Sequence, residues 1–158
     1  MLPIVIVDDS HEDIVLAVRV LQQCKILNPI VTLTSGAEAL KYFEGAGEYA
    51  NRELPCLLFL DLAMHPMNGV EVLRRLRSHF QAAGSLAIML SGIEDLKMVT
   101  EGYRSGATTF LVKPLRCEDL MDLTSSVRGI AIENTSAGYI LSLNPSAKKD
   151  TGLLSMVF

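Results

Sequence analysis

Five polar side chains able to bind a metal or carry a nucleophile stand where apolar runs of the sequence end. They are Asp8, Asp9, Asp61, Ser91 and Lys113. Together they offer three carboxylates, a hydroxyl group and an ammonium group. Mg²⁺ prefers oxygen ligands, and it binds phosphate readily beside a few carboxylates and waters. The residue types therefore indicate a metal-assisted site that accepts a phosphoryl group.

Three carboxylates at one place need a compensating positive charge. Two carboxylates ~5 Å apart repel each other by about 3 kcal/mol at an effective dielectric constant of roughly 20. Protonation of one carboxylate or a bound cation relieves this repulsion. Each residue alone also has an ordinary structural explanation, since an aspartate after a strand often caps the next helix. The combination, with a polar group after four of the five apolar runs, favours the metal site.

The apolar runs alternate with segments of helical periodicity, and these elements would position the polar groups. Five continuous apolar runs, typical of parallel strands covered on both faces, are Ile4–Val7, Ile30–Leu33, Cys56–Leu60, Leu86–Leu90 and Thr109–Val112. Ser10 and Asp13 resemble a capping box before the first helical segment. The pattern predicts an α/β fold, a doubly wound five-stranded parallel sheet of flavodoxin-like type with helices on both faces. Ligands of such sheets bind beyond the carboxyl ends of the strands.

Composition limits the possible classes of function. The chain has 158 residues, a formal net charge of −4 and 49% hydrophobic residues. These values argue against a nucleic-acid binder, an anionic-membrane binder and a disordered chain. No apolar run approaches the ~20 residues of a membrane-spanning helix. The N-terminus lacks the basic region of a signal peptide, so we expect a cytoplasmic protein.

The three cysteines are widely separated and form no CxxC pair. Cys24, Cys56 and Cys117 are therefore predicted to be small buried hydrophobic residues in a reducing cytosol. Neither a disulfide framework nor a zinc site is expected.

The motifs at the strand ends resemble those of the receiver domains of two-component response regulators. The resemblance covers roughly residues 3–130 and is carried by Val5–Ser10, Leu58–Leu62, Asn68-Gly69, Leu90–Gly92 and Leu111–Leu115. It implies transfer of a phosphoryl group from a phosphohistidine of a sensor histidine kinase to this chain. The long connection Phe43–Pro55 further resembles a subgroup of single-domain regulators that work with phytochrome-type kinases.

The resemblance implies a role for each acidic residue. Asp61 would be the phosphoacceptor. Asp8 and Asp9 would hold Mg²⁺ together with Asp61, and the backbone carbonyl of Ala63 would complete the protein ligands.

The resemblance also implies a switch. Ser91 and Lys113 would each contact a phosphoryl oxygen, and Phe110 would fill the space that Ser91 leaves when it moves inward. The partner-binding face would be the fourth helix, fifth strand and fifth helix, around Leu96–Ser105 and Cys117–Ile130.

One loop departs from the family pattern. The family commonly has proline four residues after the acceptor, but this chain has His65 there and Pro66 one position later. His65 could be taken for a metal ligand or a general base. We expect a loop residue with neither role.

We expect a stand-alone receiver at residues 1–132, followed by a C-terminal extension at 133–158. No nucleic-acid-binding or membrane-binding segment is expected, and the output would be binding of another protein or homodimerisation. Within the extension, Tyr139–Leu143 and Leu153–Phe158 are apolar. They would extend a dimer interface or cap the fifth helix, and disorder is the alternative.

A receiver is not an enzyme in the ordinary sense, because it catalyses only its own phosphorylation and dephosphorylation. Two other functions stay open. A small Mg²⁺-dependent aspartyl phosphohydrolase would use Asp61 as nucleophile, but it usually needs a second carboxylate where Ala63 stands. A degenerate receiver would be an interaction module that is never phosphorylated.

Overall fold

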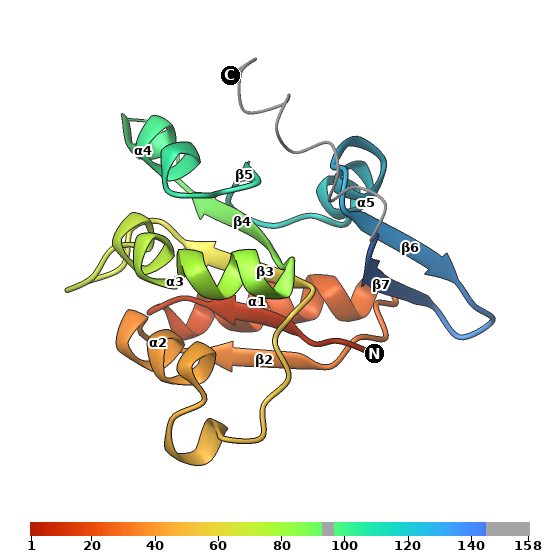
Figure 1. The fold of residues 1–158 in the computed structure, drawn as a ribbon. Helices are drawn as coiled ribbons and strands as arrows, with labels where there is room; N and C mark the ends of the chain where they lie inside the picture. Colours follow the sequence, from red (N-terminus) through yellow and green to blue (C-terminus); the bar gives the residue numbers. More distant parts are fainter. Residues whose placement is uncertain (93–96, 145–158) are drawn as a thin grey trace.

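The computed structural model describes residues 1–92 and 97–144, which form a layered α/β structure (Figure 1). Its central sheet has five parallel strands in the order β2-β1-β3-β4-β5. Their bounds are Ile4–Val7 (β1), Ile30–Leu33 (β2), Leu57–Asp61 (β3), Leu86–Ser91 (β4) and Thr109–Val112 (β5). The predicted five-stranded parallel sheet is confirmed.

Both faces of the sheet are apolar because alternate residues of the central strands enter different cores. All four residues of β1 and all five of β3 are buried. Ile4 and Phe59 belong to the core cluster on one face. Val5 and Leu58 belong to the cluster on the other face. This double burial explains why the strands are continuous apolar runs rather than alternating ones.

Helices cover both faces of the sheet. Their bounds are His11–Gln23 (α1), Gly36–Glu44 (α2), Gly69–Ala83 (α3), Val99–Arg104 (α4) and Cys117–Ser126 (α5). Residues of α1 and α5 share one core cluster, and residues of α2 and α3 share the other. Ser10 and Ser35 cap α1 and α2, since each Oγ accepts a hydrogen bond from the N–H three residues later. Within the described ranges, no helix has the length and apolar character needed to span a bilayer.

The fifth helix is shorter than the sequence predicts. The fifth helix is expected within Cys117–Ile130, and the apolar spacing of Leu120, Leu123, Val127 and Ile130 is helical, but α5 ends at Ser126. Gly129 has a φ of 102°, a conformation that regular helices do not contain. Ile130 then begins strand β6 (Ile130–Asn134). The Cys117–Ile130 part of the predicted partner-binding face therefore contains helix α5 and the first residue of strand β6. Residues 93–96, which include the predicted start of the other part, lie outside the described residues.

Strand β6 pairs antiparallel with β7 (Tyr139–Leu143) as a separate two-stranded sheet. The backbone of Tyr139 exchanges hydrogen bonds with Lys25 and Leu27 at 2.7 and 2.8 Å, which attaches this hairpin to the end of α1. The apolar segment 139–143 is thus ordered structure. The division of the chain at residue 132 falls inside β6 and stays a prediction, and Leu153–Phe158 lies outside the described residues.

The cysteines correct one expectation. Cys56 is buried and free, as predicted. Cys24 and Cys117, however, form a disulfide with a Cα–Cα distance of 5.6 Å. Residues 114–116 carry the chain from the carboxyl edge of the sheet back to the end of α1, so that Cys117 meets the C-cap residue Cys24. This path depends on tertiary packing, and it cannot be read from the spacing of the three cysteines.

The long connection Phe43–Pro55 contains a short 3-10 helix, η1 (Gly47–Tyr49). Arg52 folds back on α2, and its Nε donates a hydrogen bond to the carbonyl oxygen of Tyr42 at 2.8 Å. The long connection before β3 is therefore partly structured.

Asn28 joins the hairpin to the main body and provides the first test. Its buried amide donates to the carbonyl oxygens of Leu2 and Leu141 and accepts from the N–H of Leu141, each at 2.8 Å. Asn28→Ala leaves these buried groups without partners, so we expect the free energy of unfolding to fall by about 2–4 kcal/mol. Urea denaturation measures the loss.

The matched control for this test is Asn51→Ala, because Asn51 is exposed. Its unfolding free energy should stay within about 0.5 kcal/mol of wild type. Equal stability of the two variants would show that Asn28 does not anchor the hairpin.

Candidate functional site

The first two carboxylates follow β1 directly. All four residues of β1 are apolar and buried, and Asp8 and Asp9 are the first polar residues after its carboxyl end. Asp8 is itself buried, with 2% of its surface exposed, whereas Asp9 is exposed. The backbone N–H of Ser10 donates to Asp8 Oδ1 at 2.9 Å, which orients this carboxylate.

Asp61 is the last residue of β3 and is 4% exposed. The N–H of Ala63 donates to its Oδ1 at 3.3 Å. Helix α3 begins close behind this strand end. A Cβ atom on Gly69 would lie 2.3 Å from the carbonyl oxygen of Asp61, so no side chain fits at that position. Glycine therefore lets α3 pack directly against the strand that presents Asp61.

The structure brings the three carboxylates of the predicted metal site together. One carboxylate oxygen from each of Asp8, Asp9 and Asp61 lies within 4.8 Å of the others. These are oxygen donors from two neighbouring strand ends, two of them buried and one open to solvent. Such a set fits a hard divalent cation that keeps part of its water shell.

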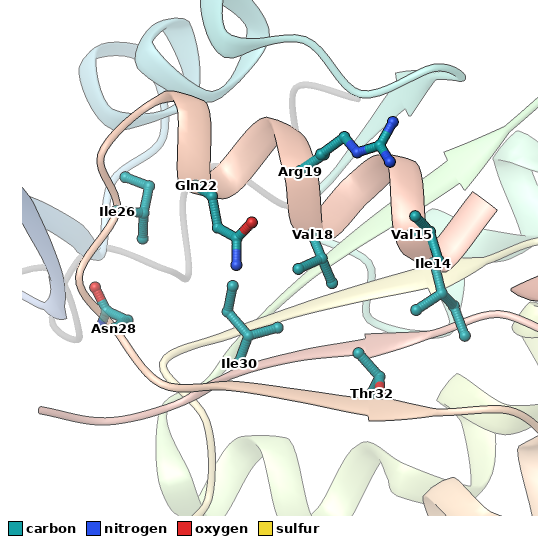
Figure 2. Close-up of a pocket in the computed structure, with 9 residues that line it drawn as sticks. All are labelled: Ile14, Val15, Val18, Arg19, Gln22, Ile26, Asn28, Ile30 and Thr32. Atoms are coloured by element: carbon teal, nitrogen blue, oxygen red, sulfur yellow. The ribbon is translucent and has the colours of Figure 1, made fainter. Parts of the chain in front are cut away.

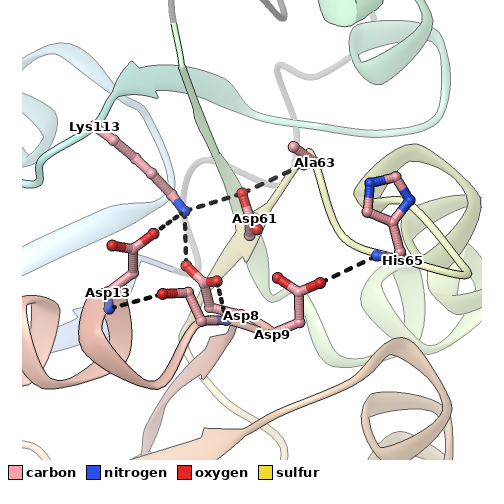
Figure 3. Close-up of polar contacts among 8 residues, drawn as sticks. Asp8, Asp9, Asp13, Asp61, Ala63, His65 and Lys113 are labelled. Atoms are coloured by element: carbon pink, nitrogen blue, oxygen red, sulfur yellow. Dashed lines mark hydrogen bonds and ion pairs between the residues drawn. The ribbon is translucent and has the colours of Figure 1, made fainter.

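Lys113 reaches the same place from the end of β5. Its Nζ lies 2.8 Å from Asp8 Oδ2 and 3.1 Å from Asp61 Oδ1 (Figure 3). A third carboxylate, Asp13 Oδ2 in the first turn of α1, is also 2.8 Å away. The ammonium group therefore lies among three carboxylates, which come from the loop after β1, from helix α1 and from strand β3.

Electrostatics at the site follow from burial and crowding. Burial raises the pKa of Asp61, the nearby Asp8 charge raises it further, and Lys113 opposes both. Burial disfavours the charged form of Lys113, but its contacts with Asp13, Asp8 and Asp61 outweigh that effect and hold its pKa above the ordinary value. Asp61 is thus a buried carboxylate beside a firmly charged ammonium group.

Ser91 is the last residue of β4 and is 1% exposed. Its carbonyl oxygen accepts a hydrogen bond from the N–H of Lys113 at 2.8 Å, so these two predicted site residues end adjacent strands. Phe110 lies on β5 and is half-buried. Its ring centroid is 4.9 Å from that of Tyr103 in α4. A Cβ atom on Gly102 would lie 2.4 Å from this ring, which shows how closely Phe110 packs on α4.

His65 contacts the site through its backbone. Its N–H donates to Asp9 Oδ2 at 3.2 Å, while the imidazole ring points away from the carboxylates (Figure 3). His65 therefore lies in a loop, as expected, and its lack of a metal-binding or general-base role stays a prediction.

Sequence reasoning missed the role of Asp13. The capping prediction is right for the backbone, since the N–H of Asp13 donates to Ser10 Oγ at 3.3 Å. The Asp13 carboxylate, however, does not return to the N–H of Ser10, which is bonded to Asp8, and pairs with Lys113 instead. The only signal in the sequence was an acidic residue one helical turn beyond Asp9, at the edge of the sheet where Lys113 ends its strand.

A groove lies on another part of the molecule. It has a volume of about 620 Å³ and runs between α1 and β2 (Figure 2). Its lining residues include no carboxylate, and they are Ile14, Val15, Val18, Arg19, Gln22, Ile26, Asn28, Ile30 and Thr32. The groove therefore lacks the acidic groups that gather at the charged edge of the sheet.

A family model described as "Response regulator receiver domain" matches residues 4–125. The chain belongs to this receiver family. Response regulator Rcp1 of Synechocystis sp. is similar to this receiver, with 25% identity over 133 residues that cover 84% of this chain and 90% of Rcp1.

Solved structures of similar receivers include regulators named for phytochromes. The bacteriophytochrome response regulator RtBRR is 27% identical with a TM-score of 0.74, covering 94% of this chain and 87% of RtBRR. The phosphorylated cyanobacterial phytochrome response regulator RcpA is 27% identical, with a TM-score of 0.66 and coverage of 77% and 87%. The Mn²⁺-bound form of Rcp1 is 25% identical, with a TM-score of 0.66 and coverage of 80% and 94%. The resemblance to the phytochrome-associated subgroup is thus confirmed.

The raised pKa of Asp61 predicts that this residue destabilises the receiver at neutral pH. The folded state binds the proton more tightly than the unfolded state. Stability is therefore lost as pH rises from the ordinary aspartate pKa of 3.8 through the higher folded value. We expect Asp61→Asn, measured without divalent ions, to raise the melting temperature by about 2–6 °C at neutral pH. This gain in melting temperature should vanish at pH values below the ordinary aspartate pKa.

The control for this test is Asp122→Asn, which removes an exposed carboxylate from α5. Its melting temperature should follow wild type at every pH. An Asp61→Asn variant that is less stable than wild type at neutral pH would contradict a raised pKa of Asp61 in the folded state.

Proposed function

We propose that Asp61 accepts a phosphoryl group from a phosphohistidine of a sensor histidine kinase, with Mg²⁺ as the cofactor. One observation carries this proposal. A buried carboxylate at a strand end faces the Lys113 ammonium at 3.1 Å and shares a 4.8 Å cluster with Asp8 and Asp9. A nucleophile, a fixed positive charge and a set of metal ligands therefore meet at one point.

In this transfer the protein mainly positions the reacting groups and neutralises charge. An oxygen of the Asp61 carboxylate forms a bond to phosphorus while the phosphorus–nitrogen bond of the donor breaks. The histidine nitrogen leaves with the electron pair. Charge on the three peripheral oxygens must be neutralised and the attacking oxygen must be in line. Lys113 supplies a positive charge, and the β3 strand end together with the Ala63 N–H orients the attacking carboxylate.

The donor set fits a divalent cation in this site. Asp8, Asp9 and Asp61 would hold Mg²⁺, and the backbone carbonyl of Ala63 would add a fourth oxygen. When bound, the ion supplies positive charge to the phosphoryl oxygens and relieves the repulsion among the carboxylates. The Mn²⁺-bound form of the similar protein Rcp1 supports the assignment.

Phosphorylation would change the surface that other proteins contact. A new dianion on Asp61 attracts hydroxyl donors, and Ser91 ends the strand next to β3. Movement of Ser91 inward would open space toward Phe110, which packs against Tyr103 and Gly102 of α4. The α4, β5 and α5 elements would therefore carry the signal.

The partners follow from the family. The upstream partner would be a sensor histidine kinase of phytochrome type, as the phytochrome regulators among the similar structures suggest. The downstream partner would be another protein or a second copy of this chain, in the cytoplasm. The receiver would signal by binding another protein and would turn over no external substrate.

Incubation with acetyl phosphate and Mg²⁺ tests the phosphoacceptor. Intact mass spectrometry of the wild-type chain should show the gain of one phosphoryl group. Asp61→Asn should gain none, because an amide is not a nucleophile for this reaction, and Asp122→Asn should behave like wild type.

Other outcomes would assign other functions. A phosphoryl group that persists in Asp61→Asn would place the chemistry at another residue. Continuous hydrolysis of phosphate esters would identify a phosphohydrolase, and no mass gain in wild type would identify a degenerate receiver.

A further inference from the structure

Lys113 has one partner more than the proposed transfer uses. Asp13 Oδ2 lies 2.8 Å from Nζ, the same distance as Asp8 Oδ2 and shorter than the 3.1 Å to Asp61. The position of Asp13 is set by the cap of α1, where its N–H is bonded to Ser10 Oγ. The cap of α1 therefore places the Asp13 carboxylate beside Lys113.

We propose that Asp13 is a positioning residue that holds the Lys113 ammonium before phosphorylation and competes with the phosphoryl group for it. This inference rests on the proposed role of Asp61 as phosphoacceptor. Asp13 touches neither the phosphoryl group nor the three-carboxylate cluster, and it acts through Lys113.

The number of donors on Lys113 creates the competition. An ammonium group has three N–H donors and no acceptor. In the structure Nζ donates hydrogen bonds to Asp8 Oδ2 and Asp13 Oδ2 and forms an ion pair with Asp61 Oδ1 at 3.1 Å. A phosphoryl oxygen that binds Lys113 must therefore compete with these three carboxylates for the ammonium group.

Burial decides which partner leaves. The side chain of Asp8 is 3% exposed, and that of Asp61 is 6% exposed and bears the phosphoryl group itself. The side chain of Asp13 is 40% exposed. Separating a buried carboxylate from its counter-ion is costly, whereas a half-exposed carboxylate regains water. The Asp13–Lys113 contact is therefore the one that breaks when a phosphoryl oxygen binds Lys113.

This exchange slows phosphorylation. The Asp13 contact must break, and its negative charge stays beside a phosphoryl group that is itself anionic. Removing the charge frees one donor of Lys113 and lowers the repulsion. Because Asp13 is half-exposed, high salt screens part of its effect.

The experiment compares phosphorylation rates of Asp13→Asn and Glu12→Gln with acetyl phosphate at saturating Mg²⁺. Glu12 is the matched control, because it lies in the same turn of α1, carries the same charge and is exposed. Asp13→Asn should be phosphorylated about 3- to 10-fold faster than wild type at low salt. Glu12→Gln should stay within about 1.5-fold of wild type, because its charge is more fully screened by water.

Several outcomes would overturn the inference. They are an Asp13→Asn rate equal to or below that of wild type, an equal acceleration in Glu12→Gln, and an acceleration that high salt leaves unchanged. A merely structural role predicts slower phosphorylation, so the direction of the change separates the two roles. The melting temperature of Asp13→Asn should not exceed that of wild type, since an ion pair is lost.

If wild type takes up no phosphoryl group at all, the proposed function fails instead.

Discussion

The Lys113 ammonium group compensates the negative charge that the fold concentrates at the carboxyl edge of its sheet. Asp8 and Asp61 are almost fully buried, and burial of an uncompensated carboxylate costs several kcal/mol. Both lie within 3.1 Å of Nζ. The compensation is incomplete, because the pKa of Asp61 remains raised by burial and by Asp8. The site therefore keeps an excess of negative charge, which favours the binding of a divalent cation.

The rest of the structure meets the geometric demands of this cluster. Strands β1, β3 and β5 must end at the same edge, and two apolar cores, one on each face, hold them in register. Gly69 allows α3 to start directly behind Asp61. The Ser10 cap places the first turn of α1 where Asp13 reaches Lys113. The charge cluster thus depends on packing far from it.

The sheet and the clustered residues could be predicted because both follow from one-dimensional patterns. Continuous apolar runs specify strands buried on both faces, and polar residues after such runs must meet at one edge of a parallel sheet. The errors arose where the tertiary path decides the outcome. Apolar spacing around Ile130 fits a helix and a half-buried strand equally well, so the end of α5 was misplaced. Two cysteines 93 residues apart meet only because of the route that the chain takes after β5. Asp13 looked like a capping residue because its alternative partner, Lys113, is 100 positions away.

The most direct test of the central interaction is an NMR measurement of the Lys113 side-chain ammonium signal, assigned with Lys113→Arg. An ammonium group held among three carboxylates exchanges its protons slowly with water and gives a resolved signal. That signal should shift when beryllofluoride and Mg²⁺ are added, because this stable mimic of a phosphoryl group on a carboxylate would take over one donor. A signal averaged with those of exposed lysines, or one unmoved by the mimic while Asp61 binds it, would show that Lys113 does not compensate the site.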